Sequence, residues 1–141
     1  MSLEEVKKRF VEEVKLRAFD DKYVDKAEER EILQIALQQG ISVDSARAAL
    51  AQVCDAEEYI LESKVQDELK DLLDTLAGND GKVDEKEYND AVAMAKKRTK
   101  GKRSEVQCKR MVMEIIGDNS YKTSTGMFSN WYKRERKALN M

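Results

Sequence analysis

Two stretches of the chain repeat the same acidic pattern. Each reads Asp, any two residues, Val, Asp, any two residues and Glu, and the copies at 21–28 and 80–87 lie 59 residues apart (80 minus 21). Carboxylate and amide oxygens are the ligands that calcium takes in proteins. The oxygen-bearing candidates are Asp21, Asp25 and Glu28 in the first copy, and Asn79, Asp80, Asp84 and Glu87 in the second. These residue types make both copies candidates for weak binding of calcium or another divalent cation.

The second copy can be aligned with the twelve-residue calcium loop of an EF-hand. Gly81, Asp84 and Glu87 then stand at the sixth, ninth and twelfth positions, each with the residue type wanted there. Leu76 and Gly78 stand at the first and third positions, where side-chain oxygens belong. Because two anchoring ligands are absent, we expect any calcium site in this loop to have a dissociation constant of about 10⁻⁴ M or weaker.

The first copy departs further from a calcium loop. Arg17 and Phe19 occupy its first and third positions, and Lys22 stands where the loop needs glycine. Both copies also have a second interpretation, because an Asp followed three residues later by Glu has the spacing of a helix capping box. Capping explains that spacing without a ligand, so we prefer it to metal binding in both loops.

Apolar residues recur at helical spacing on both sides of each acidic stretch. With 41% hydrophobic residues, 38% charged residues and no proline, the composition is typical of uninterrupted amphipathic helices. We predict an all-α fold: a single compact domain of about seven helices, built around two EF-hand-like helix-loop-helix units. A loop or short extended piece is expected within 55–61. The helices are expected to begin near residues 3, 25, 42, 63, 84 and 104, and the last one carries Met127, Phe128, Trp131, Tyr132, Ala138 and Leu139.

The stretch from Phe19 to Leu33, followed by Ile35-Ala36 and the junction at 40–44, resembles the opening motif of the TerB-like tellurite-resistance domains. Residues 79–87 resemble a second copy of that motif, and the likeness covers 19–44 and 79–95, less than a third of the chain. The resemblance implies an all-helical domain with metal-binding acidic loops, found in stress-response or membrane-linked assemblies rather than in catalysis. The residues it would carry over are Asp21, Asp25, Asp80 and Glu87.

Charge is unevenly distributed along the chain although the net charge is only −2. Residues 1–95 contain 13 Lys and Arg against 24 Asp and Glu, a net charge of −11, whereas residues 96–141 contain 13 against 4, a net charge of +9. We expect an acidic helical core over 1–95 and basic C-terminal helices over 96–141 that pack on the same domain.

The densest group of cations is a candidate site for an anionic partner. This basic patch consists of Lys96, Lys97, Arg98, Lys100, Lys102 and Arg103. Attraction to phosphate needs little more than such a cluster, so nucleic acid is one possible partner. Phe128, Trp131 and Tyr132 lie at one-turn spacing beside other apolar residues, and we expect them in the core rather than stacked on bases.

The chain contains no histidine, and its two cysteines, Cys54 and Cys108, have no evident activating neighbour. Because catalysis needs a nucleophile, an acid-base pair or a metal-held water, we expect no enzymatic activity and two buried, reduced thiols. No run of about 18 apolar residues is present, so we expect no transmembrane segment and a cytoplasmic protein. The favoured function is a non-catalytic protein-interaction or regulatory module that needs no cofactor and binds another protein. The alternatives are weak calcium binding through 79–87 and nucleic-acid binding through 96–103.

Overall fold

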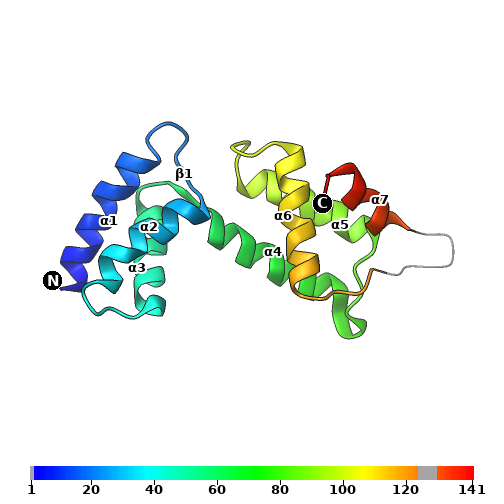
Figure 1. The fold of residues 1–141 in the computed structure, drawn as a ribbon, viewed down its shortest axis with the longest axis horizontal. Helices are drawn as coiled ribbons and strands as arrows, with labels where there is room; N and C mark the ends of the chain where they lie inside the picture. The colour runs from blue at the N-terminus through cyan, green and yellow to red at the C-terminus, as the bar shows by residue number, and fades with distance from the viewer. Residues whose placement is uncertain (1, 124–129) are drawn as a thin grey trace. The chain divides into compact units, whose positions relative to one another are not determined.

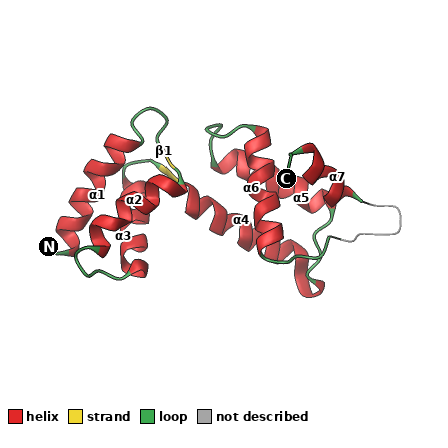
Figure 2. Ribbon diagram, in the orientation of Figure 1, coloured by secondary structure: helices red, strands yellow, loops and turns green. Residues whose placement is uncertain are grey.

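The structure is a computed structural model that describes residues 2–123 and 130–141 of the chain. Within those residues it contains seven α-helices, one 3₁₀ turn and two strands of two residues each (Figure 2). The prediction of an all-α fold with about seven helices is therefore confirmed. Met127 and Phe128, which the sequence places in the last helix, lie outside the described residues. The chain divides into two compact units, residues 1–64 and residues 65–141.

Unit 1 is built on three helices that contact one another, labelled in Figure 1: α1 (Leu3–Arg17), α2 (Lys26–Leu37) and α3 (Val43–Ala56). Each helix contributes a large, fully buried side chain to one core, namely Phe10, Ile32 and Leu50. The core forms because apolar residues one turn apart give each helix a single apolar face.

Unit 1 also contains a sheet of two short strands. Strand β1 (Tyr23–Val24) precedes α2, and strand β2 (Ile60–Leu61) precedes α4 (Glu62–Ala77), whose first residues belong to this unit. The strands are parallel, with Tyr23 beside Ile60 and Val24 beside Leu61. The short extended piece predicted within 55–61 is thus confirmed.

Unit 2 contains the remainder of α4, the 3₁₀ turn η1 (Gly78–Asp80), α5 (Glu85–Arg98), α6 (Glu105–Asp118) and α7 (Trp131–Ala138). A single parallel bridge joins Lys82 to Lys122. Two backbone hydrogen bonds hold it: Val83 N donates to Lys122 O at 2.8 Å, and Lys122 N donates to Gly81 O at 2.9 Å.

The two units repeat one arrangement of helices and extended residues. In each, an acidic corner follows the first helix, two helices come next, and an extended residue then pairs back with the corner. In unit 1 Ile60 N donates to Lys22 O at 2.9 Å, and in unit 2 Lys122 N donates to Gly81 O at 2.9 Å. Counterparts lie 59 residues apart at the corner (81 minus 22) and 62 apart at the extended residue (122 minus 60).

The buried positions of the two units also coincide. On the first helix and just after it, the buried residues are Val6, Phe10, Val14 and Ala18 in unit 1, and Val65, Leu69, Leu73 and Ala77 in unit 2. On the third helix they are Ala46, Ala49, Leu50, Val53 and Cys54 in unit 1, and Cys108, Met111, Val112, Ile115 and Ile116 in unit 2, where Met113 is buried as well. The repeat therefore extends beyond the acidic corners and into the basic C-terminal part of the chain.

Candidate functional site

The first aspartate of each corner holds a backbone amide. In unit 1 Asp21 Oδ1 accepts a hydrogen bond from Tyr23 N at 3.1 Å. In unit 2 Asp80 Oδ1 accepts from Lys82 N at 3.0 Å. A side chain that bonds the backbone two residues ahead forms a turn of its own. These carboxylates therefore shape the chain just before the extended residues.

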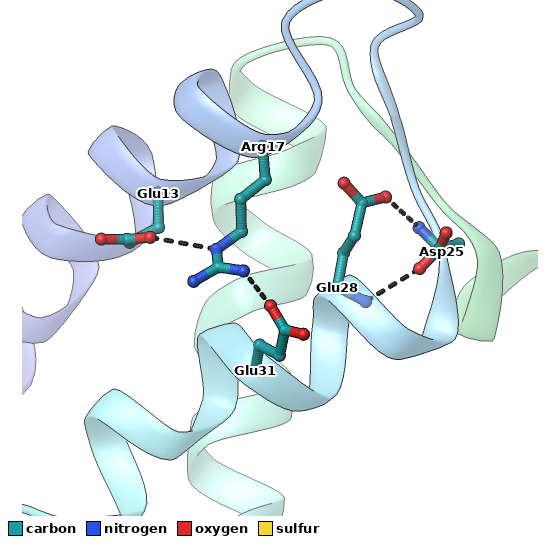
Figure 3. A network of polar contacts seen from close by, with 5 residues as sticks. All are labelled: Glu13, Arg17, Asp25, Glu28 and Glu31. Carbon is teal, nitrogen blue, oxygen red and sulfur yellow. Dashed lines mark hydrogen bonds and ion pairs between the residues drawn. The ribbon is translucent and has the colours of Figure 1, made fainter.

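The second aspartate and the glutamate of each corner form a capping box. Asp25 Oδ1 accepts from Glu28 N at 2.8 Å, and Glu28 Oε1 accepts from Asp25 N at 3.1 Å (Figure 3). The corresponding distances for Asp84 and Glu87 are 2.8 and 3.0 Å. Each box satisfies amides that a helix start leaves without partners. The capping interpretation is confirmed for both corners.

The metal-binding candidates of unit 2 lie in two elements. Asn79 and Asp80 are exposed in η1, whereas Asp84 and Glu87 are partly buried in the capping box at the start of α5. Within residues 2–123 and 130–141 no group of three or more His, Cys, Asp or Glu side chains is arranged to hold a metal ion. Calcium binding through either corner stays a prediction.

Arg17, at the first position of the calcium-loop alignment, makes ion pairs near the first corner. Its Nε lies 3.1 Å from Glu13 Oε2 on the same helix, and its Nη1 contacts Glu31 on α2. Figure 3 shows the guanidinium between these carboxylates, beside the Asp25 capping box. A cation here ties α1 to α2.

The basic patch lies at the end of α5 and in the turn that follows it. Five of its six cationic residues are exposed, and Arg103 is partly buried. Thr99, in the middle of the run, is buried, and its hydroxyl donates to Ala95 O at 2.8 Å. Arg98 Nε lies 3.2 Å from Glu68 Oε2. The patch is thus anchored through one buried residue and presents most of its charge at the surface.

The aromatic residues near the C-terminus are not a free stacking platform in the described part. Trp131 is 1% exposed, which confirms its predicted place in the core. Tyr132 is half-buried, and its hydroxyl accepts from Arg136 Nη1 at 3.2 Å. Phe128 lies outside the described residues.

Both cysteines are buried, as the sequence predicts. Burial raises the pKa of Cys54 to about 12 from its ordinary value of 9.0, and the negative charge of Glu29 adds to this effect. Burial also raises the pKa of Cys108, against a hydrogen bond with Thr99 that lowers it. Thiols with raised pKa values stay protonated at neutral pH and are poor nucleophiles.

A pocket of about 350 Å³ opens on unit 1. Its lining consists of Lys26, Glu29, Arg30 and Leu33 on α2, Arg47 on α3 and Ser63 on α4. Only 7% of Glu29 is exposed. Glu29 Oε1 accepts a hydrogen bond from the Ser63 hydroxyl at 2.9 Å and lies 3.8 Å from Arg47 Nε. The buried carboxylate is thus paired, and every other charged residue of the lining is cationic.

The corresponding place in unit 2 holds two aromatic rings. The counterpart of Glu29 is Tyr88 on α5, and Trp131 of α7 lies against it with the ring centroids 5.2 Å apart. Trp131 begins the helix that follows the extended residue Lys122, just as Ser63 lies in the helix that follows β2. Tyr88 in unit 2 therefore has an aromatic partner, whereas its counterpart Glu29 in unit 1 has the hydroxyl of Ser63.

The charged residues around this place differ between the units. Glu85 pairs with Arg134 of α7, with Nη2 at 3.0 Å from Oε1 and 2.9 Å from Oε2. Its counterpart is Lys26. Within residues 2–123 and 130–141, the side chain of Lys26 makes no hydrogen bond and no ion pair. The counterparts of Arg30 and Arg47 are Asn89 and Lys109. Unit 1 thus has more positive charge at this place than unit 2.

Reasoning from the sequence did not identify the pocket. The available signal was Glu29, which shares a helical face with Ile32, Leu33 and Ala36, all buried. A carboxylate on an apolar face needs a partner, because burying an unpaired charge is costly. That partner, Ser63, is 34 residues away and no local pattern points to it.

Comparisons of the chain with protein-family models, with curated proteins and with solved structures found no match. The resemblance to TerB-like domains and to EF-hands therefore stays a prediction. In the part of the chain that the structure describes, no helix has the length and apolar character needed to cross a membrane.

Proposed function

We propose that the chain is a non-catalytic helical protein-interaction module and that the pocket of unit 1 is its recognition site. The observation that carries the proposal is the open pocket with three cationic side chains in its lining. Its volume of about 350 Å³ falls within the range of roughly 300–1,000 Å³ that ligand sites occupy. In unit 2 the counterpart of Glu29 is Tyr88, which packs against Trp131.

Two further observations support a non-catalytic role. The two thiols are buried and have raised pKa values, which keeps them in the unreactive protonated form. The carboxylates of both acidic corners are engaged with backbone amides of their own loops. A regulatory or stress-response role, which the TerB-like resemblance implies, and a cytoplasmic location are part of the same proposal.

The test is affinity capture of proteins with the full chain, compared between the parent and charge-reversal variants. Lys26→Glu changes the pocket, Lys97→Glu changes the basic patch, and Lys8→Glu is the control on the exposed part of α1. We expect at least one captured protein to be lost with Lys26→Glu and retained with the control. The proposal is wrong if every captured protein is recovered with Lys26→Glu as well as with the parent.

Calcium binding through residues 79–87 is the second candidate function. It is favoured by Gly81, whose φ of 67° gives the sharp turn that a calcium loop needs, and by three carboxylates within eight residues of sequence, Asp80, Asp84 and Glu87. Calorimetry at millimolar calcium should give heat with the parent and none with Asp84→Asn, since asparagine retains the cap but removes the charge. Absence of heat with the parent would exclude this candidate.

A further inference from the structure

We propose that the pocket of unit 1 binds a glutamate or aspartate side chain presented by a short acidic segment of another protein. The inference rests on the proposed function and adds the chemistry of the partner. It starts from the charges of the lining, which consists of three cations, one carboxylate, Leu33 and Ser63.

The one carboxylate of the pocket is already compensated inside unit 1. Glu29 accepts the Ser63 hydrogen bond at 2.9 Å and lies 3.8 Å from Arg47 Nε. Lys26 and Arg30, both exposed, have no hydrogen bond or ion pair of the side chain within residues 2–123 and 130–141. An incoming carboxylate would therefore meet two cations with uncompensated charge. A guanidinium such as that of Arg30 can offer it two parallel N–H donors.

In unit 2 the residue that corresponds to Lys26 has the opposite charge. There Glu85 receives both of its hydrogen bonds from Arg134, at 3.0 and 2.9 Å. With lysine in place of glutamate, an ion pair at the corresponding position of unit 1 requires an acidic partner group. The described part of the chain supplies none to Lys26, so we place that acid on another molecule.

The remaining charge of unit 1 favours a short acidic segment over a longer polyanion. The unit contains 10 Lys and Arg against 15 Asp and Glu, a net charge of −5. A nucleic acid would meet repulsion beyond the pocket, whereas one or two acidic side chains need only the pocket itself. Helix α7 of a second copy is excluded as the occupant of the pocket, because four of its eight residues are cationic and would be repelled by the cations of the lining.

The test is an NMR titration of the isotope-labelled full chain with a short, end-capped peptide of alternating glutamate and alanine. We expect saturable shifts of the backbone amides of Lys26, Glu29, Arg30 and Arg47, and no such shifts with a glutamine-alanine peptide. The proposal is overturned if no saturable shifts occur at millimolar peptide, or if the larger shifts fall in the basic patch. It is also overturned if sodium acetate binds the pocket as tightly as the peptide, or if an oligonucleotide binds it more tightly.

Two variants test the named cations. Lys26→Glu introduces the residue type of Glu85 and should weaken peptide binding about tenfold, because it removes one ion pair and adds repulsion. Arg30→Asn introduces the residue type of Asn89 and should weaken binding about threefold. Lys8→Glu makes the same charge change as Lys26→Glu outside the pocket and should have little effect. Glutamate near the start of a helix is favourable, so Lys26→Glu should fold.

Failure of this inference can be told apart from failure of the proposed function. If captured proteins are lost with Lys26→Glu but the glutamate-alanine peptide gives no saturable shifts, the pocket is the recognition site and the acidic-segment proposal is wrong. If the peptide binds the pocket but no captured protein depends on any surface, the proposed function is wrong. Self-association that sedimentation detects and Lys26→Glu abolishes would place the acidic segment on a second copy and overturn the assignment to another protein.

Discussion

Lys22 and Gly81 occupy the same place in the two corners, and both have a left-handed backbone, with φ values of 55° and 67°. A residue with a side chain pays roughly 1–2 kcal/mol in this region, because its Cβ approaches a carbonyl oxygen too closely. A Cβ added to Gly81 would meet no atom within 4 Å, so its surroundings offer no steric obstacle. The carbonyl oxygen of each residue accepts the hydrogen bond from the extended residue of its unit, and this pairing fixes the conformation.

Exchanging these residue types should therefore change stability in opposite directions. Lys22→Gly should raise the free energy of unfolding by about 0.5–1 kcal/mol, since relief of strain exceeds the entropy that glycine adds to the unfolded chain. Gly81→Lys should lower it by about 1 kcal/mol. Urea unfolding followed by circular dichroism measures both. A loss of stability with Lys22→Gly would show that the Lys22 side chain makes a contact that outweighs the strain.

Cys54 should titrate far above an ordinary thiol. With a pKa of about 12 instead of 9.0, its thiolate fraction at pH 8 is about a thousandfold lower than in the unfolded chain. Alkylation of native Cys54 at pH 8 should be slower than in urea by at least that factor. The measurement uses a Cys108→Ala background, because alanine is the counterpart residue at Ala46.

The same raised pKa links Cys54 to stability at alkaline pH. A raised folded-state pKa means that the native state holds the proton more tightly than the unfolded state. The contribution to stability is thus complete below about pH 9 and is lost as pH rises through about 12. Equal alkylation rates in native and unfolded chains would contradict the burial of this thiol.

At the scale of elements, the capping boxes decide where α2 and α5 begin. Asp84→Ala should lower the free energy of unfolding by about 1 kcal/mol, because it leaves amides at the start of α5 without a partner. Asp84→Asn should cost little, since asparagine is an equally good N-cap residue. Asp90→Ala, an exposed position on the same helix, is the control. If Asp84→Asn were as damaging as Asp84→Ala, the charge rather than the cap would matter.

Helix α7 is held in unit 2 by an aromatic anchor and by polar contacts of its exposed side. Trp131 is buried against Tyr88, whereas Arg134 makes an ion pair at the surface. Trp131→Ala should cost about 3 kcal/mol or more, as truncation of buried aromatic residues does. Arg134→Ala should cost no more than about 1 kcal/mol. Denaturant unfolding of both variants compares them, and similar losses would mean that charge, not burial, holds α7.

At the scale of the whole molecule, charge and packing divide the chain at different places. The net charge of the chain changes sign near residue 95, inside α5, whereas the boundary between the two compact units falls after residue 64. Unit 2 contains 16 Lys and Arg against 13 Asp and Glu, a net charge of +3, so acidic and basic segments share one unit. Packing is set by the apolar faces of helices, on which the surface charge has little influence.

The basic patch allows a prediction about the charge of the whole molecule. Any affinity for a single-stranded oligonucleotide should decline with salt, with a slope of log K against log salt no steeper than about −4 for six cations. Lys97→Glu with Lys102→Glu should abolish that affinity, while Lys8→Glu should leave it. Binding titrations at several salt concentrations measure the slope. Absent or salt-independent binding would remove nucleic acid as a partner.

The sequence by itself determined the helices, their starts and the repetition of the acidic corner. Apolar spacing and capping boxes act within one or two turns, so these features could be predicted without knowing how the helices meet. The acidic candidates Asp25, Glu28, Asp84 and Glu87 were likewise found from spacing, and their capping contacts confirm the preferred interpretation.

Only the tertiary structure decided which side chains of different helices contact one another. Glu29 meets Ser63 across 34 residues, and Tyr88 meets Trp131 in the corresponding place of unit 2. Each pair joins side chains of separate helices, so it depends on how those helices pack and has no signature in local sequence. The pocket of unit 1 is lined by residues of α2, α3 and α4, so only the packed structure reveals it.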